Sequence, residues 1–147
     1  MAELTTEQVF NGDIAKVFHG IGQYARYPEF LPGVTGIKVL PPQAAGSVCQ
    51  VTYELKLIKS FYYTLDMFEE KPSRIWWNLA ASNLMKRSNG SWLLSPAGAG
   101  KTKAVYTLDI GFSGLVPSKI VDQITKANLS GMMIGFQKLI DSSVSPQ

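Results

Sequence analysis

Apolar and polar residues alternate along much of the middle of the chain. The alternation is clearest over residues 49–57, where every odd-numbered residue is apolar and every even-numbered residue is polar. The odd-numbered residues of 61–67 and 75–79 are also apolar, and from Ala104 to Phe112 every second residue is apolar. Because successive side chains of a strand point to opposite faces of a sheet, this period of two predicts half-buried strands.

Turn and composition signals place further elements around these strands. Additional strands are predicted at Leu4–Asn11, Val34–Leu40 and Leu84–Leu94. Asp13 can cap a short helix over Ile14–His19, and a second short helix is expected to end near Arg26. From Tyr27 to Gly33 we expect no regular structure, because two prolines and a glycine interrupt those seven residues.

After Val116 the pattern of the chain becomes helical. Pro117 suits the first turn of a helix, and apolar residues then recur every three to four positions as far as Ile140. The residues of this face are Val121, Ile124, Met132, Phe136 and Leu139. A helix of about 24 residues would be about 36 Å long. Gly131 and Gly135 weaken it, which favours either the close approach of another element or space left for something else.

A curved antiparallel sheet has one apolar face to cover, and the long helix has one apolar face to bury. The economical arrangement therefore wraps the sheet around the helix. We predict an α+β fold, in which a curved antiparallel sheet of about seven strands surrounds a long C-terminal helix and two short helices follow the first strand. The 147 residues are expected to form a single domain over residues 1–141, followed by a flexible tail over 142–147.

The segment SPAGAGKT, Ser95–Thr102, ends as a phosphate-binding P-loop ends. The P-loop pattern needs a glycine where Ser95 stands, and it needs a helix after its lysine, because the helix N-terminus binds the phosphates. Here a strand pattern follows instead. We interpret the segment as a hairpin turn that uses Gly98 and Gly100 for positive φ angles.

The charge and the cysteine content exclude several classes of site. The net charge is +3 and the basic residues are dispersed, the longest cluster being Lys86-Arg87, so no nucleic-acid partner is expected. The single cysteine, Cys49, excludes an internal disulfide and a multi-cysteine metal site. The sequence shows no cluster of metal ligands, and we expect no metal and no cofactor.

The chain shows no targeting or membrane-spanning pattern. Its first ten residues lack the basic start and apolar core of a signal peptide, and no apolar run approaches the ~20 residues of a membrane span. We therefore expect a cytoplasmic protein without a transmembrane segment, for which a peripheral membrane contact remains open. The sequence does not indicate an oligomeric state.

One segment carries a family resemblance. Lys16–Phe18 is followed by Tyr24–Val34, which contains the core YPEFLP, and support comes from Gly90-Ser91-Trp92 and from the ending Met132-Met133-x-x-Phe136. Together with the order of the predicted elements, these residues resemble the START/Bet v 1-like (SRPBCC) superfamily, which has the helix-grip fold. Within it, the resemblance is to the branch of polyketide cyclases/dehydrases and lipid transport proteins, which includes COQ10-like coenzyme Q-binding proteins.

The resemblance implies a cavity between the sheet and the C-terminal helix that binds an apolar or amphipathic molecule, with the loop Tyr27–Pro32 at its mouth. Residues of the mouth, the inner sheet face and the helix would line this cavity. They are Tyr27, Phe30, Tyr53, Leu55, Phe61, Tyr63, Trp77, Leu79, Trp92, Tyr106, Leu108, Ile124, Met132 and Phe136. The hydroxyls of Tyr53, Tyr63 and Tyr106 would bind a ligand oxygen or find a backbone partner, as buried tyrosines usually do.

We therefore expect a protein that binds or transports a hydrophobic small molecule, such as a lipid, a quinone or a polyketide-like compound. One alternative is a polyketide cyclase or dehydratase that uses the same cavity, with tyrosine or arginine donors in place of a nucleophile. We assign no catalytic residue, because His19 has no evident nucleophile partner and Glu54, Asp66 and Asp109 fall on polar strand faces. A non-enzymatic role is favoured.

A second alternative is a ribosome- or protein-associated interaction module. That role needs a basic face, for which Lys86, Arg87, Lys101 and Lys103 are the best candidates. Binding of this kind would depend steeply on salt, because the release of counterions drives it. Arg26 precedes the mouth loop, where an acidic end of a ligand would enter.

Overall fold

The computed structural model describes residues 2–31, 33–56, 60–114, 116–119, 121 and 129–143. Its elements, in chain order, are β1 (Ala2–Asn11), α1 (Ile14–Ile21), the 3-10 helix η1 (Tyr24–Glu29), β2 (Val34–Leu40), β3 (Cys49–Lys56), β4 (Ser60–Glu70), β5 (Arg74–Ser82), β6 (Met85–Pro96), β7 (Lys101–Phe112) and α3 (Leu129–Ser142). Residues 118, 119 and 121 are also helical.

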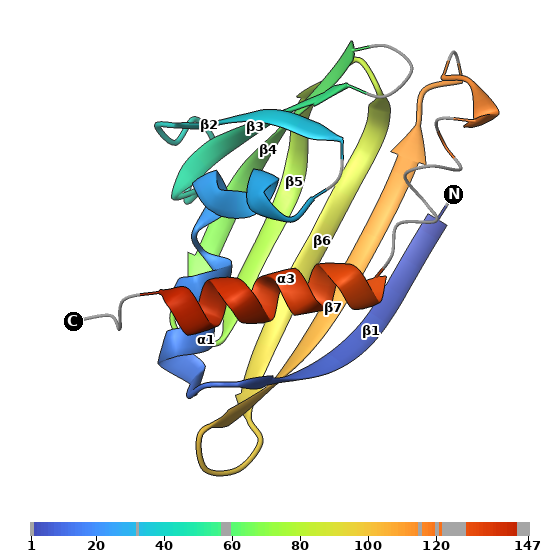
Figure 1. Ribbon diagram of the computed structural model, residues 1–147. Helices are drawn as coiled ribbons and strands as arrows, with labels where there is room; N and C mark the ends of the chain where they lie inside the picture. The colour runs from blue at the N-terminus through green and yellow to red at the C-terminus, as the bar shows by residue number, and fades with distance from the viewer. Residues whose placement is uncertain are drawn as a thin grey trace.

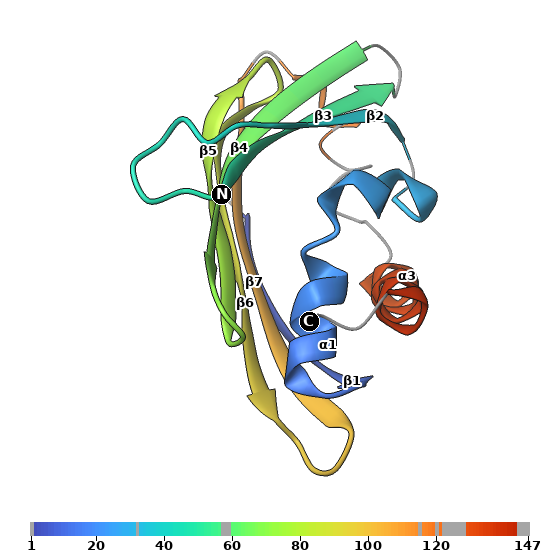
Figure 2. The same cartoon turned by 90° about the vertical axis from the view of Figure 1, so that its left-hand side faces the viewer.

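The strands form one antiparallel sheet of seven strands in the order β1-β7-β6-β5-β4-β3-β2, which confirms the predicted sheet. The first strand therefore lies beside the last one, and β1 and β2 form the two edges (Figure 1). The sheet is strongly curved, and α1, η1 and α3 all lie on its concave side (Figure 2). This is the helix-grip arrangement that the sequence predicts.

The predicted alternation is confirmed strand by strand. In β3, Val51, Tyr53 and Leu55 are buried, whereas Glu54 and Lys56 are exposed. The strands register so that buried residues face buried residues, because Tyr53 lies opposite Tyr63 and Leu55 lies opposite Phe61 across the β3–β4 ladder. The concave face is therefore apolar and the convex face carries most of the polar side chains.

Helix α1 starts as predicted and ends later than predicted. The Asp13 side chain caps it by accepting a hydrogen bond from the backbone N–H of Lys16 at 2.9 Å. The predicted end at His19 is wrong, because the helix continues through Gly20 to Ile21. A Cβ at Gly20 would stand 2.7 Å from Cγ1 of Ile140, so this glycine allows α1 to pack closely against α3 and does not break the helix.

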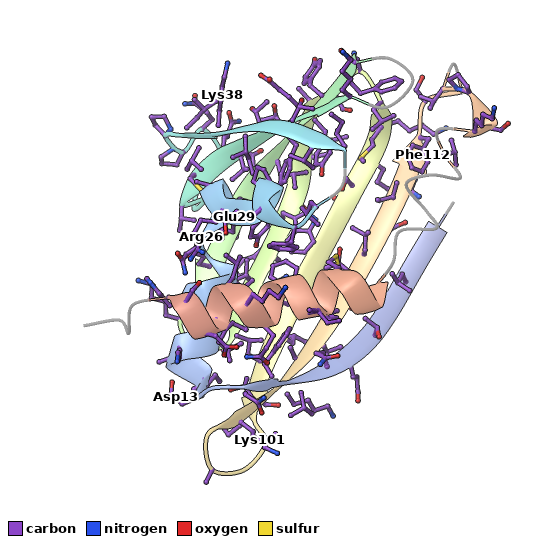
Figure 3. All side chains as sticks on the ribbon, in the orientation of Figure 1. Asp13, Arg26, Glu29, Lys38, Lys101 and Phe112 are labelled. Carbon is purple, nitrogen blue, oxygen red and sulfur yellow. The ribbon has the colours of Figure 1, made fainter. Side chains whose placement is uncertain are left out.

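The absence of regular structure predicted from Tyr27 onward is also wrong. The 3-10 helix η1 continues through Tyr27 and Pro28 to Glu29. A proline fixes φ near −65°, which suits a 3-10 turn, and the turn is closed by the N–H of Phe30, which donates to the carbonyl of Tyr27 at 3.2 Å. Figure 3 shows the Arg26 and Glu29 side chains of this segment next to one another, and their Nε and Oε2 atoms are 2.9 Å apart.

Helix α3 has 14 described residues, which corresponds to about 21 Å, and they form the C-terminal part of the predicted helix of 24 residues. Residues 122–128, and with them Ile124, lie outside the described residues, as do residues 144–147 of the predicted tail. Met133, Phe136, Leu139 and Ile140 are buried, and Ile140 packs against Gly20 of α1. The apolar face predicted for this helix is therefore confirmed over its described part.

The SPAGAGKT segment forms a turn between β6 and β7, as predicted. Gly98 and Gly100 have φ angles of 115° and 68°. The N–H of Ala97 donates to the carbonyl of Lys101 at 3.0 Å, which closes the hairpin. Because the strand β7 follows this turn, no helix N-terminus is available there to bind a phosphate.

Candidate ligand-binding cavity

A cavity of about 200 Å³ lies between the concave face of the sheet, η1 and α3. Five strands, β3 to β7, contribute to its walls. The lining residues are Tyr27, Leu31, Tyr53, Leu55, Tyr63, Leu65, Met67, Ile75, Trp77, Met85, Ser88, Trp92, Tyr106, Leu108, Ile110, Met132 and Phe136. All of these are apolar or aromatic except Ser88, and none carries a charge.

Most of the predicted site residues meet at this cavity. Tyr27, Tyr53, Leu55, Tyr63, Trp77, Trp92, Tyr106, Leu108, Met132 and Phe136 line it. Phe61 does not, because it is buried at the far end of β4 in a second cluster that includes Leu84 and Met85. Leu79 is also absent from the lining, although it is partly buried and packs against both hydrophobic clusters. Ile124 lies outside the described residues.

Phe30, the remaining predicted site residue, packs on the helix rather than in the cavity. Its ring lies 4.9 Å from the ring of Phe136 and 5.9 Å from that of Tyr27. It covers Gly135, where an added Cβ would stand 2.7 Å from the Cβ of Phe30 and would overlap its ring. Of the two explanations for a glycine in this helix, the structure selects close approach at Gly135.

The cavity also contains residues that were not predicted. They are Leu31, Leu65, Met67, Ile75, Met85, Ser88 and Ile110. Leu65, Met67 and Ile75 belong to the inward-facing alternation, so the period of two could have identified them. Ser88 is in phase with Trp92 and Leu94, but its polar side chain hid it from a pattern of apolar residues, whereas Met85 lies beyond a register shift between Met85 and Arg87 that changes which residues of β6 face inward.

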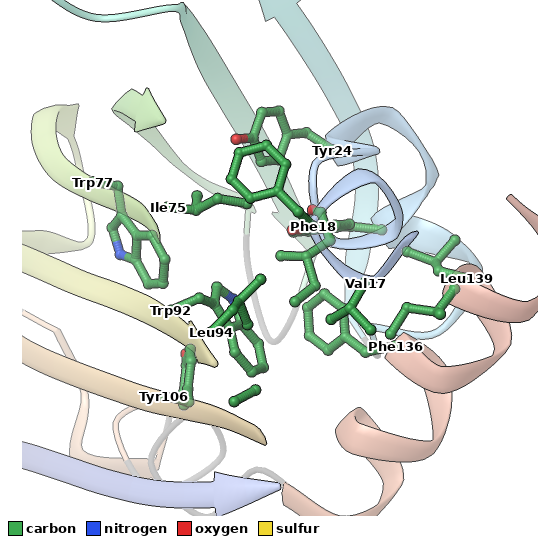
Figure 4. Packing of buried hydrophobic residues seen from close by; sticks show 14 of the residues in the cluster. Val17, Phe18, Tyr24, Ile75, Trp77, Trp92, Leu94, Tyr106, Phe136 and Leu139 are labelled. Atoms are coloured by element: carbon green, nitrogen blue, oxygen red, sulfur yellow. Dashed lines mark hydrogen bonds between the residues drawn. The ribbon is translucent and has the colours of Figure 1, made fainter. Parts of the chain in front are cut away.

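Aromatic rings form the wall of the cavity beneath α3. The ring of Trp92 lies 4.8 Å from that of Tyr106 and 5.1 Å from that of Phe136 (Figure 4). Trp77 completes this wall at 6.1 Å from Tyr106. Its indole lies directly over Gly90 of the neighbouring strand, where any side chain would overlap it. The GSW sequence of β6 thus places one indole and makes room for another.

Four tyrosines approach one another around the cavity, and one has a hydrogen-bond partner in the fold. The hydroxyl of Tyr27 donates to the carbonyl of Ile21 at 2.5 Å. For the hydroxyls of Tyr53, Tyr63 and Tyr106, no partner is found among the described residues, and none of these hydroxyls is a fully buried unpaired atom. The backbone partners suggested for these three tyrosines are therefore not found in the part of the chain that the structure describes.

The tyrosines are held in their neutral form. Burial raises the pKa of Tyr53, Tyr63 and Tyr106 well above the ordinary value of 10.0. The ring of Tyr53 lies 4.5 Å from that of Tyr63 and 6.4 Å from that of Tyr27, and these neighbours raise the pKa of Tyr53 further. At neutral pH these groups therefore donate hydrogen bonds but do not act as bases, and they are weak acids.

The charged residues considered for chemistry lie elsewhere and are paired. Asp109 accepts two hydrogen bonds from the guanidinium of Arg87, each 3.0 Å long. Asp66 accepts one from Gln50 at 2.9 Å, and Oε1 of Glu54 lies 3.7 Å from Nζ of Lys38. These carboxylates belong to the outer face of the sheet. Within the described residues, no group of His, Cys, Asp and Glu could hold a metal ion.

A second hollow of about 310 Å³ lies between α1 and the β4–β5 hairpin. Its lining includes His19, Glu69 and Lys71, and Glu69 accepts a hydrogen bond from the hydroxyl of Tyr24 at 2.7 Å. The walls of this hollow come from α1 with the residues that follow it and from the β4–β5 hairpin, whereas the walls of the aromatic cavity come from five strands and two helices. We therefore take the aromatic cavity as the candidate site.

Among the described helices, none is long and apolar enough to cross a membrane.

Comparisons with known proteins agree with this architecture. The START superfamily protein of Mycobacterium smegmatis has a similar structure, with a TM-score of 0.75 at 14% identity over 95% of this chain and 97% of that one. The Zhui aromatase/cyclase of Streptomyces sp. R1128 has a TM-score of 0.71 at 11% identity, over 95% and 90% of the two chains. At these identities the likeness concerns the fold alone.

Sequence comparisons give a more specific result. A ribosome association toxin, RatA, of Vibrio cholerae is 27% identical over 132 residues, which cover 85% of this chain and 88% of that protein. The family model described as "Polyketide cyclase / dehydrase and lipid transport" matches residues 1–140. The superfamily expected from the YPEFLP segment is thereby confirmed, while its COQ10-like branch stays a prediction. The chain belongs to the polyketide cyclase/dehydrase and lipid transport family, within the START/Bet v 1-like superfamily.

Proposed function

We propose that the protein binds a hydrophobic small molecule in the cavity between the sheet, η1 and α3. The observation that carries this proposal is the wall of the cavity, in which described residues from five strands and two helices surround about 200 Å³ and none of these residues is charged. Ligand sites of proteins are typically concave, largely apolar and equipped with a few polar groups. Ser88 and the tyrosine hydroxyls provide those groups here.

The energetic cost of an empty cavity supports the presence of an occupant. A dry apolar cavity costs about 24 cal/mol per Å³ in measured cores, so 200 Å³ corresponds to about 5 kcal/mol. This is comparable with the total stability of a small domain, about 5–15 kcal/mol. A bound molecule that restores the lost contacts would offset much of this cost, because anything that binds the folded state stabilises it.

The chemistry of the walls favours binding over catalysis. A cyclase or dehydratase would use the same cavity, and it would need groups that accept and return protons. The described lining residues include no His, Asp, Glu, Lys or Arg, and the tyrosines have raised pKa values. They are suited to fixing a ligand oxygen or to stabilising negative charge that develops on it, and this second role is what a cyclase would require.

Native mass spectrometry of the purified protein, with organic extraction, tests the proposal. The wild type should carry a hydrophobic passenger at up to one molecule per chain. Leu108→Trp fills the cavity and should remove the passenger, whereas Thr107→Val, on the outward side of the same strand, should retain it. Equal retention by Leu108→Trp, or failure of the folded protein to retain or bind any apolar compound, would refute the proposal.

The relative with 27% identity suggests a second role, association with the ribosome. Of the basic residues considered for it, Arg87 is bound to Asp109, and Nζ of Lys103 lies 3.4 Å from Oε1 of Glu7. Lys86 and Lys101 are exposed but lie toward opposite ends of the β6–β7 ladder. Cosedimentation with ribosomes at low and high salt tests this role, and binding that is absent at low salt would exclude it.

A further inference from the structure

We propose that the cavity selects a compact, neutral aromatic molecule that carries a hydrogen-bond-accepting oxygen, and that it rejects carboxylates and phosphate head groups. This inference rests on the proposed function and specifies its ligand class. It follows from three properties of the wall, which are its lack of charge, its set of hydroxyl donors and its size.

The first property is that, among the described residues, no cation in the wall could pair with an anionic ligand. None of the lining residues is charged. The arginine near the mouth, Arg26, is already bound by both carboxylate oxygens of Glu29, at 2.9 and 3.1 Å, and Arg87 is bound by Asp109 on the convex face. A carboxylate that left water for this cavity would lose its hydration without gaining a partner, which is among the most unfavourable transfers in proteins.

The second property is a set of hydroxyl groups with no partner among the described residues. Tyr53, Tyr63 and Tyr106 come from β3, β4 and β7, and Ser88 from β6 is 3% exposed. Tyr53 and Tyr63 lie opposite one another in the ladder, and their rings stack at 4.5 Å with an interplanar angle of 14°. Two parallel phenols therefore meet the ligand side by side. Because Nε2 of Gln23 is the one fully buried side-chain polar atom without a partner among the described residues, these hydroxyls are not sealed off, and they can donate to an accepting oxygen of a ligand in the cavity.

These hydroxyls keep their protons, because burial raises the pKa of each of the three phenols. They consequently offer hydrogen-bond donors over the whole neutral pH range. A carbonyl or ether oxygen matches such donors without bringing a charge into the cavity. A hydrocarbon would fill the space but would leave the hydroxyls unsatisfied.

The third property is size. An engineered apolar cavity of about 150 Å³ binds benzene, so about 200 Å³ accommodates a molecule of one or two rings and not the acyl chains of a phospholipid. The rings of Trp92, Tyr106 and Phe136 lie at tilted or edge-on angles of 45° and 73° to one another, and further aromatic rings pack favourably against such walls.

Equilibrium dialysis of the full chain, freed of passengers, against three probes of similar shape tests the inference. Naphthalene supplies the rings alone, 2-acetylnaphthalene adds a neutral accepting oxygen, and 2-naphthoate adds a charged group. We expect 2-acetylnaphthalene to bind roughly ten-fold more tightly than naphthalene, the equivalent of about one net hydrogen bond. The naphthoate should bind at least about a hundred-fold more weakly than 2-acetylnaphthalene.

Tyrosine-to-phenylalanine variants assign the effect to the wall. Tyr53→Phe, Tyr63→Phe and Tyr106→Phe keep the rings and remove one hydroxyl each, so they should reduce the preference for 2-acetylnaphthalene over naphthalene. Tyr62→Phe is the matched control, because Tyr62 precedes Tyr63 in β4 and is 40% exposed on the other side of the strand. It should leave all three affinities unchanged.

The outcomes separate this inference from the proposed function. If naphthalene and 2-acetylnaphthalene bind equally, or if the naphthoate binds as well as they do, the cavity binds apolar molecules and the inferred selectivity is wrong. If the folded protein binds none of the three probes, both the selectivity and the proposed function are wrong. If the three tyrosine variants keep the wild-type preference for 2-acetylnaphthalene over naphthalene, the inferred selectivity is also wrong.

Discussion

The ring of Phe30 occupies the space that a side chain at position 135 would need. Phe30 directly follows η1 and Gly135 lies in the middle of α3, so this contact fixes the segment beside the cavity to the C-terminal helix. Phe136 backs the same ring at 4.9 Å. Tyr27 and Leu31, on either side of Phe30 in the chain, both line the cavity. The contact therefore determines where one wall of the site stands.

Replacing Gly135 by alanine should destabilise the protein. Alanine is favoured over glycine in a helix by about 1 kcal/mol, but the added Cβ overlaps the Phe30 ring, and overpacking of this kind costs about 1–3 kcal/mol. Urea unfolding would measure the change. In the Phe30→Ala background the obstruction is gone, so Gly135→Ala should become stabilising there. An equal effect in both backgrounds would show that the contact is unimportant.

Gly90→Ala should disturb the aromatic wall. Its Cβ would overlap the indole of Trp77 and stand 2.7 Å from the carbonyl oxygen of Thr107, so either the indole or the strand must move. We expect a loss of about 1–3 kcal/mol in unfolding free energy and weaker binding of apolar probes. Gly114→Ala is the matched control, because no atom lies within 4 Å of the added carbon there. A loss of the same size at Gly114 would indicate a general backbone effect.

Removal of the Tyr27 hydroxyl should affect stability, in contrast to the other cavity tyrosines. Tyr27→Phe leaves the carbonyl of Ile21 without its partner in a buried position, which costs about 1–3 kcal/mol. Tyr106→Phe removes a hydroxyl for which no partner is found among the described residues, so its unfolding free energy should change by less than about 0.5 kcal/mol. Thermal and urea unfolding of the two variants would compare them, and equal losses would contradict the assignment of these hydroxyls.

Stability should fall steeply at alkaline pH. The pKa values of Tyr24, Tyr27, Tyr53, Tyr63 and Tyr106 are raised in the folded state, mainly by burial. Each tyrosine therefore holds its proton more tightly when folded than when unfolded. Its contribution to the free energy of unfolding is complete below pH 10, the ordinary pKa of tyrosine. As the pH rises above 10, each group loses about 1.4 kcal/mol of this contribution per pH unit.

Urea unfolding across this range, together with the ultraviolet absorbance of phenolate, would check the alkaline prediction. The phenolate signal of these tyrosines should appear together with unfolding. If they ionise near pH 10 while the protein stays folded, their burial is not as the structure describes.

The regular part of the fold was accessible from the sequence because burial on one face of a sheet imposes a period of two. The buried residues of β3 and β4 show this period without interruption, and most of the cavity lining follows from it. Where the ladder shifts register, the period no longer indicates the inward face. Met85 was overlooked for this reason, because it lies beyond the shift in β6, whereas Ser88 was overlooked because its side chain is polar.

The packing of helices and loops was less accessible, because it depends on contacts between distant residues. Gly20 and Gly135 suggest helix breaks or weak points when only their own segments are considered. In the structure each allows a close contact, with Ile140 and with Phe30 respectively. Pro28 likewise suggested irregular structure, although its fixed φ angle suits the 3-10 turn that it occupies.

The pairing of β1 with β7 has a consequence for how the chain reaches this fold. Residues Ala2 to Asn11 pair with Ile110 to Lys101, so the first strand finds its neighbour about ninety residues or more further along the chain. Every other strand pairs with the next one in sequence. During synthesis the hairpins from β2 to β7 can therefore form in order, while β1 has to wait for β7 with its apolar side uncovered. Closure of the β1–β7 ladder is a contact of high sequence separation, and we expect it to be a late, slow step of folding.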